Sequence, residues 1–366
     1  MSLLIKKSSI IFFIFLITIF LEFINIRVAQ IIFVVTTLFL LFNFLVSKGY
    51  FLLGIIFFIL SFLVNLAHYQ LGLSGILFFS TIIAAQFIYH EYSIDPLKIF
   101  KSTLLLWGLI IIYLLFSFNF NLNIADAISG SHNHLNTLLL PFFLIASCIL
   151  IRLNKDPFIK NTKFHTIAYI TLSITSFIIS IFFTGRTGVI LGLIGILTVY
   201  FLTRKQTRVT DLVIILSIPY IIIHFLEVLI FFQTYSGGIQ KFAMVNLQND
   251  VRFEIILFWL EDLSNINTWL GYQNNYFMNK FGVGSHNGFI QIYGSYGILG
   301  FSLFMFIVFY CLILMIKMRN FSLIAIFSLL LIRIFSDSVA NSIGIMICFW
   351  FIVLLSLHKN VTKQNF

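Results

Sequence analysis

Three arginines interrupt apolar segments of this chain and are the first candidates for chemistry. Arg186 lies between glycines in FFTGRTGVILGLIG, Arg252 lies in DVRFEIILFWLEDL, and Arg333 lies near the end of an apolar run. Charges beside hydrocarbon are costly, so those that persist are candidate functional residues. A guanidinium offers a planar fork of donors to phosphate oxygens, so converging arginines would fit a diphosphate. Snorkelling to lipid headgroups is the alternative for each arginine, and Asp337 offers Arg333 an ion-pair partner one turn later.

A histidine and an asparagine stand together in GVGSHNGFIQIYGSYGILGF, where His286 and Asn287 precede an apolar run. The positive end of a helix starting there would favour a nearby anion, and a neutral imidazole can accept a proton near neutral pH. Helical spacing places Tyr293 on the same face as His286. Three glycines on this helix would let a neighbouring chain or a lipid tail approach closely, namely Gly294, Gly297 and Gly300.

A second pair of histidines, His132 and His134, lies in ADAISGSHNHLNTLL. Their spacing raises the alternative of a zinc site, but no carboxylate or third histidine follows at a useful spacing. We therefore expect these side chains to bind sugar hydroxyls, and we expect no metal or other cofactor.

The composition requires a membrane environment for the elements that hold these residues. Of the 366 residues, 60% are hydrophobic and 9% are charged, and the mean hydropathy is +1.07. Apolar runs of a length that crosses hydrocarbon repeat along the whole chain, so residues 1–366 are expected to form one all-α polytopic membrane domain. About twelve transmembrane helices are predicted, at approximately 8–26, 28–46, 49–67, 71–90, 99–118, 135–152, 164–183, 187–203, 210–232, 286–316, 320–335 and 339–357.

The basic residues orient these spans. With both termini in the cytoplasm, all but six of the 22 lysines and arginines lie on the cytoplasmic side, as the positive-inside rule requires. The exceptions are Arg27, Arg186, Lys241, Arg252, Lys280 and Arg333. Because the formal charge of +10 is spread over short loops and forms no single patch, topology explains it better than nucleic-acid binding.

The longest polar segment, residues 233–285, falls on the outer side. Within it, Val251, Ile255, Phe258 and Trp259 share one helical face, which predicts a helix lying on the membrane surface. The chain has no phosphate-binding loop and no dinucleotide fingerprint, so chemistry is expected at the outer face with a lipid-linked substrate.

The outer-face motifs together resemble the O-antigen ligases and the related O-antigen and capsular polysaccharide polymerases. HNGFIQIYGSYG is similar to their H-[NS]-x6-G-x-x-G pattern, RFEIILFW to their R-x6-W segment, and GRTGVIL to their arginine-glycine start of a span. The resemblance covers roughly residues 180–340. The ligases prefer R-x-x-x-L, whereas Ile190 stands at the fourth position after Arg186 here, which disfavours a strict ligase.

The resemblance implies a GT-C-like glycosyltransferase in the bacterial inner membrane, with its active site on the periplasmic side. It would act without metal and invert the sugar, transferring a glycan from an undecaprenyl-diphosphate-linked oligosaccharide. His286 would be the catalytic base, and Arg186 and Arg252 would hold the diphosphate. From their positions and residue types, and apart from the resemblance, we expect substrate contacts from Asn287, Tyr293, Arg333, Asp337, His132 and His134. A polysaccharide polymerase is the first expectation, with a chain-length regulator as a candidate partner besides membrane lipids. An O-antigen ligase acting on lipid A-core is the alternative, and a lipid-linked oligosaccharide flippase is the alternative from another class.

Overall fold

The computed structural model describes twelve helices and the segments next to them. The described residues are 14–15, 17–22, 25–43, 47–69, 72–118, 132–155, 162–182, 186–203, 251–265, 268–272, 276–285, 287–336 and 342–358. All regular structure in these ranges is helical. The helices are α2 (Ile26–Asn43), α3 (Lys48–Ala67), α4 (Ser74–Ile94), α5 (Pro96–Phe118), α7 (His132–Lys155), α8 (Thr162–Phe182), α9 (Arg186–Thr203), α12 (Val251–Asp262), α13 (Tyr276–Phe281), α14 (Gly288–Lys317), α15 (Phe321–Ser336) and α16 (Ile343–His358).

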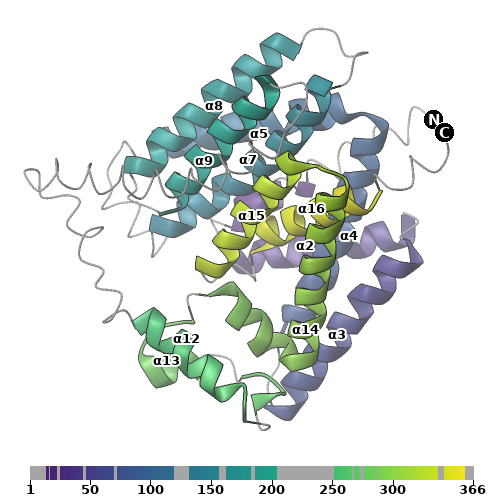
Figure 1. Ribbon diagram of the computed structural model, residues 1–366, viewed down its shortest axis with the longest axis vertical. Helices are drawn as coiled ribbons and strands as arrows, with labels where there is room; N and C mark the ends of the chain where they lie inside the picture. Colours follow the sequence, from purple (N-terminus) through teal and green to yellow (C-terminus); the bar gives the residue numbers. More distant parts are fainter. Residues whose placement is uncertain are drawn as a thin grey trace, which may run out of the picture.

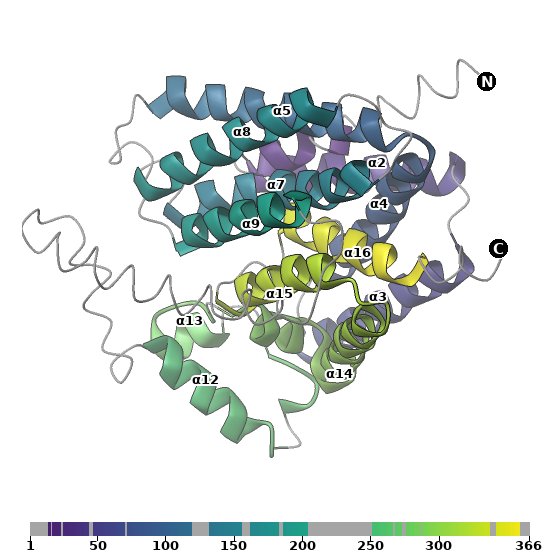
Figure 2. The same cartoon turned by 45° about the horizontal axis from the view of Figure 1, so that its top comes forward.

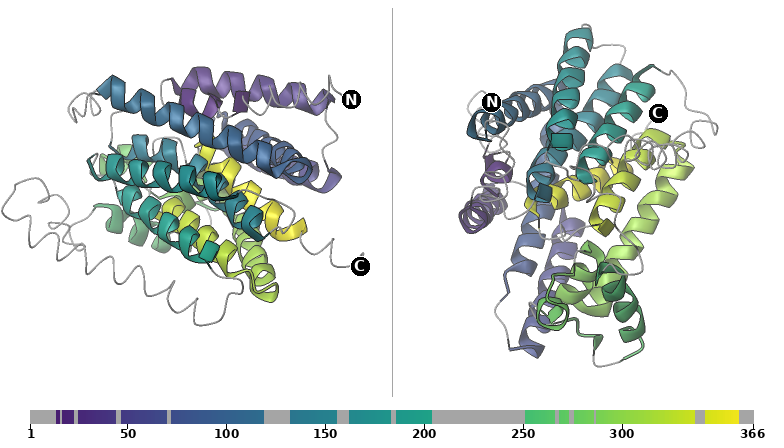
Figure 3. Two further views of the ribbon diagram at one scale, coloured as in Figure 1. Left: turned by 90° about the horizontal axis from the view of Figure 1, so that it is seen from above. Right: turned by 90° about the vertical axis from the view of Figure 1, so that its left-hand side faces the viewer.

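The helices form two groups joined by a central pair. The group of α5, α7, α8 and α9 packs together on one side, and α3 and α14 pack together on the other (Figures 1 and 2). Between them run α15 and α16, which contact helices of both groups. The short helices α12 and α13 lie beside α14, away from the α5–α9 group (Figure 3).

Burial separates central from peripheral helices. Every residue of 138–151 in α7 and of 343–354 in α16 is buried. In contrast, α3 and α14 expose large apolar side chains such as Phe62 and Phe306. A helix that is apolar on all faces is stable either inside a protein or against lipid. The central helices lie inside the protein, and the exposed apolar faces of α3 and α14 suit contact with lipid.

Two fully buried hydrogen bonds link helices of the α5–α9 group. The indole Nε1 of Trp107 in α5 donates to Ser176 Oγ in α8 at 2.8 Å, and Ser147 in α7 shares a 2.7 Å hydrogen bond with the hydroxyl of Tyr169 in α8. Such bonds add specificity where lipid gives no hydrophobic drive to helix association.

Most predicted spans coincide with helices. Within the described ranges, three helical segments are long and apolar enough to cross a membrane, and they are Lys48–Ala67, Pro96–Phe116 and Gly288–Lys317. Seven further predicted spans match shorter or more polar helices to within four residues at each end. The span 210–232 lies outside the described residues, and 8–26 is described only in part.

One expectation needs correction, because the span 286–316 is not a continuous helix. Within α14 the backbone at Gly297 is non-helical, with φ 66° and ψ −172°. The segment before this break, residues 288–296, is called the half-helix below. Figure 1 shows the bend in α14.

Candidate functional site

The half-helix is held by a short piece of the preceding loop, residues 268–272, called the strap. The amide of Ile298 donates to the carbonyl of Trp269 at 2.8 Å, and the amide of Tyr272 donates to the carbonyl of Gly294 at 3.2 Å. In an unbroken helix, Ile298 N–H would donate to Gly294 C=O. The amide of Ile298 and the carbonyl of Gly294, which would pair with each other in an unbroken helix, therefore both have partners in the strap.

Two glycines permit this close crossing. A Cβ at Gly297 would lie 2.6 Å from the carbonyl oxygen of Trp269. Gly271 has φ 86°, and its missing side chain would meet the backbone of Gly294. The expectation that a neighbour approaches α14 at its glycines is confirmed at Gly294 and Gly297, and the neighbour is the strap.

An aromatic cluster fixes the half-helix against α12 and α13. Ile255 of α12 and Ile290 and Tyr293 of the half-helix are all fully buried. The indole of Trp259 contacts the rings of Tyr293 and Phe301 edge-on, with centroids 5.9 and 5.5 Å apart. The apolar face predicted for α12 is therefore correct in its residues, but protein covers it, and the expectation that it lies on the membrane surface is wrong for that face.

Tyr272 closes this cluster from the strap side. Its ring stacks on Tyr276 at 4.9 Å between centroids, and its hydroxyl donates to Asp262 Oδ2 at 3.0 Å. Burial raises the pKa of Tyr272 above its usual value, and the hydrogen bond to Asp262 raises it further. The phenol therefore remains a donor, and the strap stays tied to the end of α12.

Two residues predicted to contact substrate make hydrogen bonds within the protein. Asn287 is the N-cap of α14, because its Oδ1 accepts from the amides of Phe289 at 2.9 Å and Ile290 at 3.2 Å. The buried hydroxyl of Tyr293 donates to the carbonyl of Thr268 at 2.8 Å. Sequence reasoning had no means of seeing the hydrogen-bond partners of these two side chains.

Arg333 lies in the last turn of α15 and is 2% exposed. A cation there interacts favourably with the negative end of the helix dipole. The side chain does not snorkel outward, so the alternative of headgroup contact does not hold for this arginine. Asp337, its expected partner, lies outside the described residues.

A contact between helix ends brings the start of the half-helix next to the end of α15. The ring of Phe289, in the first turn of the half-helix, lies 6.1 Å from that of Phe335, in the last turn of α15. Helix α9, which begins at Arg186, packs on α15. The segment next to His286 and the end of α15 that carries Arg333 are therefore neighbours.

The remaining predicted residues are placed only in part. The backbone of Arg186 begins α9, that of Arg252 lies in α12, and those of His132 and His134 begin α7, whereas their side chains lie outside the described residues. His286 lies outside them entirely. Among the described side chains no three His, Cys, Asp or Glu residues are grouped as a metal site would require.

Glu22 is half-buried and makes a polar contact that sequence reasoning missed. Its carboxylate accepts from the amides of Ile343 at 3.0 Å and Gly344 at 3.4 Å and from Ser342 Oγ at 3.3 Å, so it caps α16 from a distant part of the chain. The one available signal was an acidic residue at the end of an apolar run, LITIFLEF.

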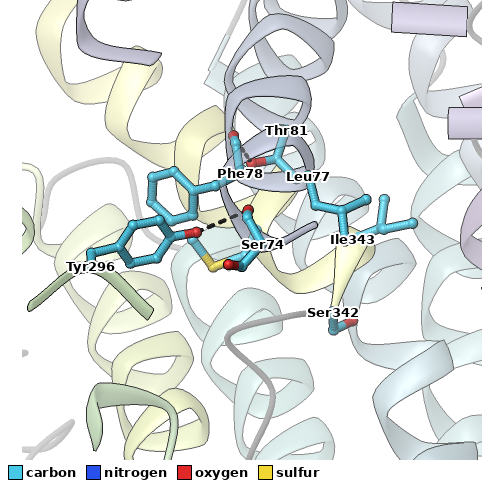
Figure 4. Close-up of a pocket in the computed structure, with 8 residues that line it drawn as sticks. Ser74, Leu77, Phe78, Thr81, Tyr296, Ser342 and Ile343 are labelled. Carbon is cyan, nitrogen blue, oxygen red and sulfur yellow. Dashed lines mark hydrogen bonds between the residues drawn. The ribbon is translucent and has the colours of Figure 1, made fainter. Parts of the chain in front are cut away.

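A small cavity lies beside this cap, between α4, α14 and α16 (Figure 4). Ser74, Thr81, Tyr296 and Ser342 supply its polar lining, and the Tyr296 hydroxyl donates to the carbonyl of Ser74 at 3.0 Å. Its volume of about 10 Å³ suits one water molecule. The cavity is therefore too small to be the site for a lipid diphosphate or a sugar.

Comparison with known proteins adds no relative: the chain matches no protein-family model, no curated protein and no solved structure.

Proposed function

We propose that this protein is a bacterial surface polysaccharide polymerase, which joins lipid-linked repeat units by glycosyl transfer from undecaprenyl diphosphate at the periplasmic face of the inner membrane. The observation that carries the proposal is the half-helix, which is held in place by the strap and by α12 and α13. The position before its cap is His286, and its first turn contacts the end of α15 that bears Arg333. In the sequence, the proposed base thus directly precedes the cap of a half-helix whose first turn lies beside the end of α15 that bears Arg333.

Three contacts between distant parts of the chain agree with the proposed topology of about twelve spans in one domain with cytoplasmic termini. The carboxylate of Glu22 meets residues 342–344, the ring of His68 meets Gly271, and the hydroxyl of Tyr296 meets Ser74. In each pair, both partners belong to ends of spans or loops that the positive-inside orientation puts on the outer side. These contacts support a single outer face on which the proposed site lies, in a GT-C-like arrangement.

The proposed reaction displaces the lipid diphosphate from the anomeric carbon. The imidazole of His286 accepts the proton of the acceptor hydroxyl as that oxygen bonds to C1, and the electrons of the C1–O bond pass to the departing diphosphate oxygen. Arg186 and Arg252 stabilise the developing charge, in the role that a divalent metal has in many glycosyltransferases. Attack from the opposite face inverts the sugar.

The N-terminus of the half-helix contributes to this reaction through the electrostatic field of the helix dipole. Asn287 Oδ1 already accepts from the amides of Phe289 and Ile290, so these two N–H groups are engaged by the protein. The positive end of the half-helix still lowers the energy of an anion nearby. The donors that hold the diphosphate are therefore expected to be guanidinium groups.

The test is the length distribution of surface polysaccharide in a strain whose copy of this gene carries His286→Ala, Arg186→Ala or Arg252→Ala. We expect the ladder of long chains to collapse to a single repeat unit on the core, at unchanged protein level. Each arginine should contribute about 3 kcal/mol, or roughly a hundredfold in rate, as one oxyanion-hole donor does. His165→Ala, at the start of α8, is the matched control and should retain the ladder.

Three results would contradict the proposal. A full ladder with His286→Ala would remove the base. Loss of every repeat unit from the core on gene deletion would indicate a ligase. In proteoliposomes, scrambling of labelled lipid-linked sugar without new glycosidic bonds would indicate a flippase.

A further inference from the structure

The strap exposes two large apolar side chains although its backbone is engaged on α14. Trp269 is 45% exposed and Leu270 is 53% exposed, while the neighbouring Gly271 and Tyr272 are buried. The indole Nε1 of Trp269 donates to the carbonyl of Leu263 at 3.1 Å. The ring is therefore held in place with its polar atom satisfied, and it presents an apolar surface outward.

This surface continues the exposed faces of two helices that are long and apolar enough to cross a membrane. Nε2 of His68 lies 3.2 Å from the carbonyl of Gly271, which joins the strap to the end of α3. Next to that contact, Leu66 and Tyr69 are exposed. On the other side, the Trp269 carbonyl is bonded to Ile298 of α14, whose neighbour Leu299 is exposed.

The outer face of α12 differs from the strap. Its exposed apolar residues Leu257 and Leu260 lie between the exposed carboxylates of Glu254 and Glu261. Carboxylates near hydrocarbon are costly, so this face requires water. The unit formed by α12, α13, the strap and the half-helix thus has one apolar and one charged outer surface.

We propose that the strap surface, formed by Leu66, Tyr69, Trp269, Leu270 and Leu299, is embedded in the outer phospholipid leaflet at the boundary between headgroups and acyl chains. The occupant is bulk phospholipid, because the surface is continuous with the lipid-facing sides of α3 and α14. Tryptophan and tyrosine are the residues enriched at that depth. The carboxylates of α12 remain in water, so the strap fixes the depth and tilt of the half-helix. This inference is independent of the proposed enzymatic activity.

The first test uses the intrinsic fluorescence of the protein in phosphatidylcholine vesicles. The chain has 4 tryptophans, so the difference between the wild type and Trp269→Phe isolates Trp269. We expect this difference signal to be quenched most by lipids brominated near the headgroup, less by lipids brominated near the chain end, and little by aqueous acrylamide. Quenching by acrylamide but not by brominated lipid would overturn the proposal. Protection from both quenchers would also overturn it, since a second protein copy would then cover the strap.

The second test compares two single cysteines with a charged, membrane-impermeant maleimide. The native residues Cys148, Cys311 and Cys348 are buried and give a low background. We expect Glu261→Cys to be labelled in vesicles, and Leu270→Cys to be labelled only after the membrane is dissolved in SDS. Equal labelling of both cysteines in intact vesicles would place the strap in water and refute the proposal.

Discussion

Substitution of Gly297 by alanine tests how closely the strap packs against the break in α14. Alanine would have to adopt φ 66° and ψ −172°, a region populated almost only by glycine. Holding another residue there costs about 1–3 kcal/mol. The new Cβ would also lie 2.6 Å from the Trp269 carbonyl oxygen, which belongs to the backbone and cannot rotate away. Displacing this carbonyl leaves the amide of Ile298 unpaired, at a further cost of about 1–3 kcal/mol.

Two other glycines supply matched controls for this prediction. Gly282 also has positive φ, at 72°, but nothing lies within 4 Å of its added Cβ, so Gly282→Ala should cost only the backbone term of about 1–2 kcal/mol. Gly294 is helical, and its added Cβ would make an ordinary contact with Tyr272 at 3.7 Å. Gly294→Ala should therefore be neutral, or stabilising by up to about 1 kcal/mol.

The assay is equilibrium unfolding of the purified protein in mixed micelles with increasing SDS, followed by tryptophan fluorescence. The expected order of stability is Gly294→Ala, then Gly282→Ala, then Gly297→Ala, with the last about 2–6 kcal/mol below the wild type. If Gly297→Ala lost no more stability than Gly282→Ala, the strap could not lie against the break. The half-helix would then not be held by the strap.

Three further substitutions probe the same region and the cap on α16. Asn287→Ala should lower stability by about 1 kcal/mol in the SDS assay, whereas Asn287→Asp should retain the cap; equal losses would argue against capping. Tyr293→Phe removes the donor to the Thr268 carbonyl and should lower stability by about 0.5–1.5 kcal/mol, with an unchanged near-ultraviolet circular dichroism spectrum. An unchanged stability would show that this hydrogen bond is unimportant. Glu22→Ala leaves the amides of Ile343 and Gly344 without their acceptor and should cost about 1–3 kcal/mol, with Glu22→Gln less severe because one oxygen remains; a neutral Glu22→Ala would mean that other groups satisfy the start of α16.

Hydropathy was sufficient to predict where most helices lie, because membrane helices need long apolar runs and the short loops supply charged breaks. It could not predict the break in α14. Gly297 stands in an apolar run with two other glycines, and a helical glycine at a close contact has the same sequence pattern as a glycine in a non-helical conformation. The difference depends on the strap, which precedes the break by more than twenty residues.

The periodicity of α12 illustrates a second limit of sequence reasoning. The residues of its apolar face were correctly assigned, since helical spacing determines which side chains lie together. What covers that face depends on a partner, and an aromatic surface packed on Tyr293 and Phe301 has the same composition as one that enters lipid. Likewise, Asn287 was expected at the site because it adjoins His286, and Tyr293 because helical spacing puts it on the same face. The sequence does not reveal the hydrogen bonds that both side chains make within the protein.

The break, the strap and the half-helix depend on one another. Irregular backbone at membrane depth is tolerated only where protein satisfies its polar groups. Here two main-chain hydrogen bonds with the strap satisfy the amide of Ile298 and the carbonyl of Gly294, so the strap can leave only if α14 straightens or exposes this amide and this carbonyl. Straightening would carry the first turn of the half-helix away from Phe335 and the end of α15. The position of the start of α14 is therefore set by residues 268–272, and changes in the strap should impair the proposed reaction without touching substrate.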